Sequence, residues 1–211
     1  VALASTRNFK WLVTFDQDSR LLPDVLQTLT HVYSAAGDSR TLVGINYWSC
    51  NKNSFFLACA SSTVVFKRRK TLITSGMLIS LETFGEIGGF REDYFIDSVD
   101  HEFCLRARSR GYQVLITCKP GMSHSIGSTR LNASWLRRKL SFDHSPTRKY
   151  YIARNAIVTI KTYFRKEPVW SACQCFRLIA DLISILLFEK EKLRKLAAFS
   201  RGFCHGVGGK M

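Results

Sequence analysis

Residues 84–112 read FGEIGGFREDYFIDSVDHEFCLRARSRGY and join an acidic stretch to a strong helix signal. The paired glycines Gly88 and Gly89 predict the end of a short helix over residues 81–87. The pattern of residues 99–110 predicts a longer helix, which Gly111 closes. Because the acidic stretch leads into this second helix, the segment places carboxylates at a helix N-terminus.

The acidic stretch runs from Asp97 to Glu102 and reads DSVDHE. Unpaired amide donors in the first turn of a helix stabilise a carboxylate as an anion, which is the form that a general base requires. Asp97 and Asp100 are therefore candidate bases. An ordinary acidic cap and first turn have the same pattern, so the structural alternative stays open at this point.

Strand and helix signals alternate before this segment, which predicts an α/β layer. Residues 10–15 (KWLVTF) have the composition of a buried strand, and a helix is expected from Pro23 to Gly37. Further strands are predicted over residues 41–47, 63–67, 77–80 and 112–118.

The acidic pair Asp16 and Asp18 follows the first predicted strand in a D-x-D pattern. Carboxylates two residues apart reach one Mg²⁺ or Mn²⁺, directly or through water, while a substrate diphosphate supplies further ligands. His124, in the sequence MSHSIG, is a candidate for completing such a metal shell. Solvated acidic turns and single polar histidines are common, so these patterns gain meaning only together.

The C-terminal part is basic and helical, with helices expected from Pro146, from Pro168 and over residues 189–203. Residues 131–211 hold 16 basic and 5 acidic side chains, which is most of the net charge of +15. Such a segment suits an anionic partner, which is a diphosphate, a nucleic acid or an acidic membrane surface. We divide the chain into a core over 1–130 and a basic amphipathic helical segment over 131–211.

Three further expectations concern the cysteines, one apolar stretch and the chain's first residues. The seven cysteines show no paired C-x-x-C spacing, so we expect neither a zinc site nor a disulfide framework, but mostly small buried side chains in a reducing cytosol. The apolar stretch 169–188 contains Arg177 and Asp181, which favours an interfacial or core helix over a membrane span. The opening at Val1 is interpreted as an internal start.

Five segments occur in an order that resembles a known enzyme family: WLVTFDQDS, TSGMLIS, the 84–112 segment, HSIG and SPTRKYYIARN. The order is similar to that of family 2 glycosyltransferases with the GT-A fold, and most similar to bacterial rhamnosyltransferases. The resemblance extends from about residue 10 to the C-terminus. It implies a Rossmann-like GT-A core of the α/β class that lacks the first nucleotide-binding strands, followed by a helical segment.

The resemblance also implies roles for particular residues. Asp16 and Asp18 would lie at the metal and the donor diphosphate, and His124 would be a further metal ligand. The residues expected to bind the donor are Ser75, Gly76 and Glu102. Asp100 matches the catalytic base, and Asp97 is its rival. Arg106 would orient the acidic stretch or contact a phosphate.

The implied activity is metal-dependent, inverting transfer of a sugar, which we expect to be L-rhamnose from dTDP-rhamnose. The acceptor would be a saccharide or lipid-linked saccharide in cell-surface polysaccharide synthesis, such as that of O-antigen. A cytoplasmic protein in peripheral contact with the inner face of the plasma membrane is expected, without nucleic acid. The alternatives are an inactive transferase fragment and a basic nucleic-acid-binding module, whose contacts would come from Arg148, Lys149, Tyr150, Tyr151 and Arg154.

Overall fold

The computed structural model describes residues 4, 6–49, 54–59, 64–124 and 143–209. The chain forms two compact units, the first made of Val1–Phe90 and Phe103–Ile126 and the second of Arg91–Glu102 and Gly127–Met211. The predicted boundary near residue 130 lies outside the described residues. Residues 91–102 belong with the C-terminal helices and not with the α/β core to which the sequence assigned them, because buried helix side chains bind their backbone.

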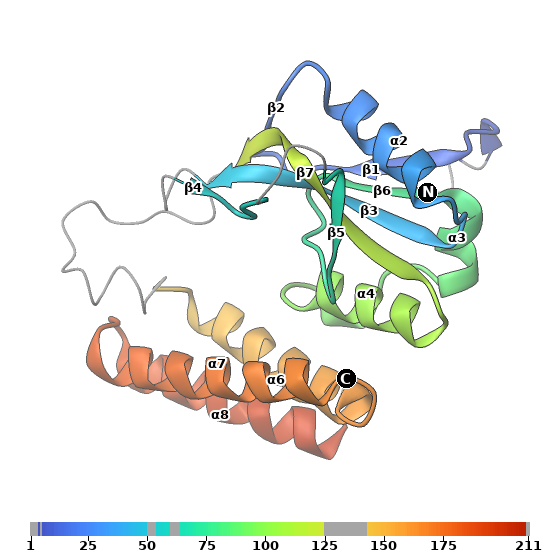
Figure 1. The fold of residues 1–211 in the computed structure, drawn as a ribbon. Coiled ribbons are helices and arrows are strands. Elements are labelled where there is room, and N and C mark those ends of the chain that lie inside the picture. The colour runs from blue at the N-terminus through green and yellow to red at the C-terminus, as the bar shows by residue number, and fades with distance from the viewer. Residues whose placement is uncertain (1–3, 5, 50–53, 60–63, 125–142, 210–211) are drawn as a thin grey trace. The chain divides into compact units, whose positions relative to one another are not determined.

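A seven-stranded mixed sheet forms the frame of the first unit (Figure 1). Its main path runs β1-β6-β3-β7-β2, with β4 paired to β3 and β5 paired to β7. The central strands β3 and β7 run parallel, whereas β1 and β6 run antiparallel. The strands are β1 (Trp11–Thr14), β2 (Arg20–Leu21), β3 (Thr41–Ser49), β4 (Ser54–Phe55), β5 (Phe66–Arg68), β6 (Met77–Ser80) and β7 (Gln113–His124).

Helices cover both faces of this sheet (Figure 1). Helix α2 (Val25–Ala36) buries Leu29 and Val32 against Val43 and Ile45 of β3 on one face. The other face is covered by α3 (Leu81–Ile87) and by the part of α4 (Val99–Ser109) that belongs to this unit. The α/β core expected from the sequence is therefore confirmed.

Most predicted boundaries agree with the structure within a few residues, but the strand predicted over 112–118 is β7, which continues to His124, and two further exceptions lie at sheet edges. Gly37 and Gly88 end α2 and α3 in the left-handed conformation that the glycines predicted. The first strand is not buried as predicted, since β1 ends the sheet path and Trp11 is 43% exposed. The strand predicted over 63–67 begins at Phe66 and ends at Arg68.

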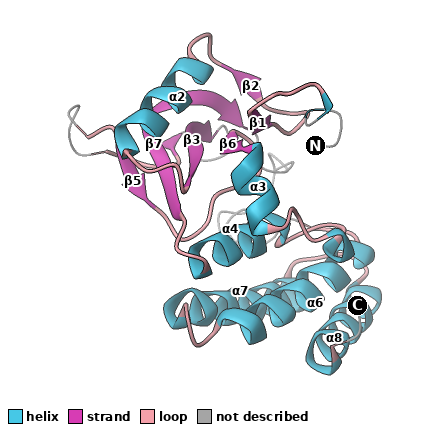
Figure 2. Ribbon diagram, turned by 90° about the vertical axis from the view of Figure 1, so that its right-hand side faces the viewer, coloured by secondary structure: helices cyan, strands magenta, loops and turns pink. Residues whose placement is uncertain are grey.

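In its described part, the second unit contains three long helices, the short 3₁₀ helix η1 (Glu92–Tyr94) and the first turn of α4. The long helices are α6 (Pro146–Tyr163), α7 (Pro168–Leu187) and α8 (Lys192–Gly208), which lie side by side (Figure 2). Prolines begin α6 and α7 as predicted. Glycine lets α8 approach α6 closely, because a Cβ at Gly202 would lie 2.2 Å from the carbonyl oxygen of Tyr150.

The expectation for the cysteines is corrected by the structure. Cys59 and Cys118, which are 59 residues apart in sequence, form a disulfide in the first unit. Cys104 is buried, whereas Cys173, Cys175 and Cys204 are exposed. The sequence spacing gave no signal for the pair, because the sheet brings the loop after β4 against the middle of β7.

Candidate active site

The D-x-D turn follows β1 and is held by a buried serine from a distant loop. The backbone N–H of Asp16 donates to Ser75 Oγ at 3.1 Å, and the hydroxyl oxygens of Ser19 and Ser75 lie 2.6 Å apart. Ser75 is 1% exposed, whereas the side chains of Asp16 and Asp18 lie at the surface. The turn thus presents two carboxylates from a fixed backbone.

Gly76 joins this arrangement through its backbone. Its N–H donates to the carbonyl oxygen of Thr14 at 2.7 Å, and Ile45 N–H donates to the Gly76 carbonyl at 2.8 Å. Its φ of +77° lies in the left-handed region, and a Cβ here would lie 2.1 Å from Cγ2 of Ile45. A side chain is therefore excluded beside the D-x-D turn.

Strand pairing brings the backbone of His124 to the same place. Arg20, two residues after Asp18, pairs with Ser123, which directly precedes His124. The side chain of His124 and residues 125–127 of the HSIG motif lie outside the described residues. The first unit therefore gathers the D-x-D turn, Ser75, Gly76 and the end of β7.

The donor atoms at the turn fit a hard divalent cation. Two surface carboxylates offer oxygen ligands of the kind that Mg²⁺ and Mn²⁺ prefer. Among the described side chains, no group of three or more His, Cys, Asp or Glu is gathered as a full metal shell. The turn alone thus supplies part of a shell, which leaves coordination positions for substrate oxygens.

The predicted bases Asp97 and Asp100 differ in their partners within the second unit. Asp97 forms a two-point ion pair with Arg148, whose Nε and Nη2 lie 3.0 and 3.2 Å from its carboxylate oxygens. Asp100 is half-buried in the first turn of α4 and accepts from the N–H of His101 at 2.8 Å. Among the described residues, no cation pairs with Asp100.

Glu102 and Arg106 occupy positions that differ from their predicted roles. Glu102 is 3% exposed and accepts a 2.8 Å hydrogen bond from Tyr163 Oη. In the first unit, the Arg106 guanidinium donates to the carbonyls of Ile87, Gly88 and Gly89 at the end of α3. Arg106 thus supplies donors for the free carbonyls at the C-terminus of α3, whereas the Glu102 carboxylate is bound to α6 within the second unit.

Ser19 and Asn155 shape these positions but had no predicted role, and Arg148 was predicted only as a contact of the nucleic-acid alternative. Ser19 follows the D-x-D pair directly, so its position in the sequence was an available signal. Arg148 and Asn155 lie in the SPTRKYYIARN segment, which is one of the five segments that carry the family resemblance. Their contacts with residues 93–97 depend on tertiary packing and leave no local pattern.

A cavity of about 770 Å³ also lies in the first unit, between α2 and the loop after β4. Its wall includes His31, Asn46 and the disulfide partners Cys59 and Cys118. None of the predicted site residues whose side chains the structure describes lines it. The cavity is thus separate from the D-x-D turn.

Comparison with known proteins agrees with the expected family. No protein-family model matches the chain. It is 28% identical over 214 residues to the dTDP-rhamnosyl transferase RfbF of Shigella flexneri, covering 94% of this chain and 69% of the relative. Among solved structures it is similar to TarS 1–349 of S. aureus in complex with UDP-GlcNAc, with a TM-score of 0.50 and 13% identity over 98% of this chain.

A second solved structure is GalNAc-T7 with UDP, GalNAc and Mn²⁺, at a TM-score of 0.45 and 13% identity over 74% of this chain. The chain spans 60% of the TarS structure's length and 36% of that of GalNAc-T7. The likeness to TarS identifies the fold as that of the GT-A glycosyltransferases. The predicted fold class is therefore confirmed.

The nucleic-acid alternative is not favoured. Its proposed contacts are used inside the second unit, where Lys149 is fully buried and Arg154 is 5% exposed. Arg148 pairs with Asp97, and Tyr150 Oη lies 2.8 Å from Nδ1 of His205. These side chains are therefore not a free surface for phosphates and bases.

Proposed function

We propose that this chain, which has the fold of the GT-A glycosyltransferases and is similar in sequence to a dTDP-rhamnosyl transferase, transfers a sugar from a nucleoside diphosphate to a hydroxyl group with inversion. The observation that carries the proposal is the D-x-D turn fixed by Ser75 at the end of β1. The similarity to a dTDP-rhamnosyl transferase supports dTDP-rhamnose as the donor.

The donor diphosphate would bind at the turn with a divalent metal ion. Asp16 and Asp18 would hold Mg²⁺ or Mn²⁺, with Asp18 as the more direct ligand and His124 as a further ligand. When bound, the ion neutralises charge on the diphosphate. Ser75 fixes the backbone of the turn, and Gly76 lets the adjoining backbone pack directly against Ile45.

Asp100 would act as the base. The acceptor oxygen forms a bond to the anomeric carbon while the bond from that carbon to the diphosphate oxygen breaks, and the acceptor proton passes to the Asp100 carboxylate. Asp97 is a poorer choice because its two-point ion pair with Arg148 occupies both carboxylate oxygens. General-base catalysis of this kind contributes about 10²- to 10⁴-fold.

The acceptor would be a saccharide carried by a lipid at the cytoplasmic leaflet, and α7 offers a surface for that leaflet. One helix in the described part of the chain, α7, has the length and composition to cross a membrane. Val169, Phe176, Ile179 and Leu187 on α7 are each more than half exposed.

Charge supports an anionic lipid surface as the partner of this helix. Exposed cations flank α7 at both ends, with Arg165 and Lys166 before it and Lys190 and Lys192 after it. Apolar side chains between basic ends favour the interface of an anionic bilayer. We therefore assign α7 to peripheral contact with the membrane.

The transfer proposal is tested by two measurements on the full chain. The first is calorimetric titration with dTDP and with UDP in Mn²⁺ or in EDTA. The second is release of dTDP from dTDP-rhamnose with water as the acceptor. We expect Mn²⁺-dependent binding that Asp18→Ala abolishes, and turnover that Asp100→Asn lowers by at least about 100-fold. Equal turnover in Asp100→Asn and the unmodified chain would reject Asp100 as the base.

The membrane proposal is tested by flotation with phosphatidylglycerol vesicles and with phosphatidylcholine vesicles. The unmodified chain should float with the anionic vesicles only, and Phe176→Ser with Ile179→Ser should remove this binding. Sedimentation analysis of the same variants measures whether the chain forms a dimer through α7. Loss of a dimer without any vesicle binding would show that α7 contacts a second copy instead.

A further inference from the structure

The loop that leads into α4 has an unusual backbone. Phe95, Asp97 and Ser98 have φ values of 53°, 64° and 63°, which place three non-glycine residues in or near the left-handed region. Such conformations cost free energy and persist only where surrounding contacts enforce them. Because these residues directly precede a candidate base, their backbone conformation is a candidate for positioning that base.

The loop also sets the start of the helix that carries Asp100. The N–H of Glu102 donates to the carbonyl of Ser98 at 2.8 Å, which is the first hydrogen bond of α4. Asp100 lies between these two residues, in the first turn. The direction of its carboxylate therefore depends on the backbone of residues 95–98.

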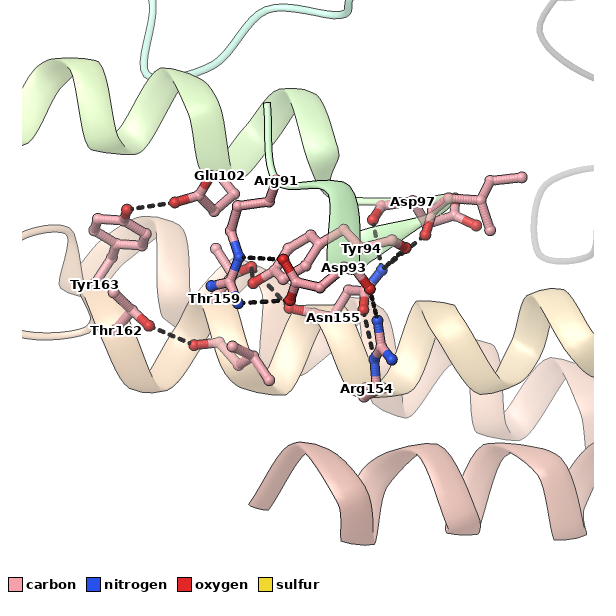
Figure 3. Close-up of polar contacts among 12 residues, drawn as sticks. Arg91, Asp93, Tyr94, Asp97, Glu102, Arg154, Asn155, Thr159, Thr162 and Tyr163 are labelled. Carbon is pink, nitrogen blue, oxygen red and sulfur yellow. Dashed lines mark hydrogen bonds and ion pairs between the residues drawn. The ribbon is translucent and has the colours of Figure 1, made fainter. Parts of the chain in front are cut away.

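One buried amide from α6 binds this loop. Nδ2 of Asn155 donates to the carbonyl oxygens of Tyr94 at 2.8 Å, Ile96 at 2.8 Å and Asp97 at 3.0 Å (Figure 3). Asn155 is fully buried, and its own oxygen accepts from Arg154 Nε at 2.9 Å. The two N–H groups of this amide thus lie against three carbonyls of one loop, with one N–H shared between two of them, and they fix the path of that loop.

Other side chains of α6 hold the same segment on either side of Asn155 (Figure 3). Thr159 Oγ1 lies 2.8 Å from Tyr94 Oη, and Tyr163 Oη donates to Glu102. Arg154 donates to the carbonyl of Asp93. Because Asn155, Thr159 and Tyr163 follow one another at intervals of four, a single face of α6 makes these contacts.

We propose that Asn155 is a positioning residue, which holds residues 94–98 in the left-handed shape that aims Asp100 at the acceptor. Arg148 assists by fixing Asp97. The inference rests on the proposed role of Asp100 as base. Apolar packing alone would bury α6 without binding consecutive carbonyls, so the polar contacts point to control of the loop's conformation.

The test compares Asn155→Ala and Arg148→Gln with Ser145→Ala, in the full chain. Ser145 caps α6 by accepting from Arg148 N–H, so Ser145→Ala weakens the helix without removing a contact to the loop. Turnover is measured as dTDP release from dTDP-rhamnose in Mn²⁺. We expect Asn155→Ala to lower kcat by about 10- to 100-fold with KM for the donor within about twofold, and Ser145→Ala to leave both unchanged.

A double-mutant cycle separates positioning from a general structural role. If Asn155 acts through Asp100, Asn155→Ala should lower turnover little further in an Asp100→Asn background. Arg148→Gln provides a second variant that folds more readily, because Arg148 is 40% exposed, and it should lower kcat in the same way. Arg148→Lys should retain more activity than Arg148→Gln, since it keeps the charge next to Asp97.

The contrary outcomes are distinct. Asp100→Asn with full activity would overturn the proposed function itself. Loss of activity in Asp100→Asn, together with an Asn155→Ala variant as active as Ser145→Ala, would overturn only the positioning role. Additive effects in the double mutant would show that Asn155 acts elsewhere.

Discussion

The hydroxyl oxygens of Ser19 and Ser75 lie 2.6 Å apart although 56 residues separate them in sequence. Ser75 also accepts from the N–H of Asp16, so one buried hydroxyl contacts both sides of the D-x-D pair. This geometry connects the loop before β6 to the turn after β1. The conformation of the turn that carries the two carboxylates therefore depends on Ser75, which lies far from the turn in the sequence.

Replacing Ser75 by alanine should therefore weaken both donor binding and the fold. The substitution leaves the Asp16 N–H without its partner and frees the turn, at a cost of about 1–2 kcal/mol in stability. We expect Mn²⁺-dependent dTDP affinity to fall by about 5- to 10-fold, because ligands held less rigidly bind less tightly. Calorimetric titration and urea unfolding measure the two effects.

Ser80→Ala is the matched control for this variant. Ser80 caps α3 by accepting from the N–H of Thr83 at 3.1 Å, and losing such a cap costs about 1 kcal/mol. Its donor affinity should equal that of the unmodified chain. Equal losses of affinity in Ser75→Ala and Ser80→Ala would mean that the hydroxyl of Ser75 has no special role at the turn.

Gly76 should tolerate no side chain. Gly76→Ala places a Cβ 2.1 Å from Cγ2 of Ile45 at a φ of +77°, so we expect a loss of about 2–4 kcal/mol in the free energy of unfolding. Gly85→Ala, in α3, meets nothing within 4 Å and should gain up to about 1 kcal/mol from helix propensity. Urea unfolding of the two variants should thus change in opposite directions.

Local signals in the sequence were sufficient for several helix boundaries, although the helix predicted over 189–203 is α8, Lys192–Gly208. Gly37 and Gly88 marked helix ends, and Pro146 and Pro168 marked helix starts, because the backbone of each residue type suits that position. The order of strands and helices, together with the motif order, was also enough to predict the fold class. These features depend on neighbouring residues only.

Features that depend on distant residues were not predictable in the same way. Glu102 and Arg106 were predicted as site residues because they lie in the acidic and basic part of the 84–112 segment. Their contacts, to Tyr163 of α6 and to the end of α3, depend on the packing of distant elements. The pairing of Cys59 with Cys118 and the edge position of β1 follow from sheet order. Sequence periodicity carries no information about strand order.

Lys149 is expected to be essential for the stability of the second unit. It is fully buried, and its Nζ lies 2.8 Å from the carboxylate of Glu189, which is also buried and which accepts from Lys195 as well. Lys149→Ala should lower the free energy of unfolding by about 3–5 kcal/mol, because it leaves buried charge uncompensated. Urea unfolding checks this value, and Arg194→Ala, which breaks an exposed ion pair with Glu191, should cost less than about 1 kcal/mol.

His144 should make stability depend on pH between about 4 and 6.5. Burial, together with the positive charges of Arg148 and Lys149, lowers the pKa of His144 from 6.5 to about 4. Because the folded pKa lies below the unfolded one, the unfolded chain binds more protons in this range. The free energy of unfolding should therefore fall as the pH drops from 6.5 to 4, and His144 should add no further loss below that. In His144→Gln, the free energy of unfolding should depend less on pH in this window. Urea unfolding at half-unit pH steps measures this dependence. The same pH dependence in the variant and the unmodified chain would mean that His144 is solvated and titrates normally.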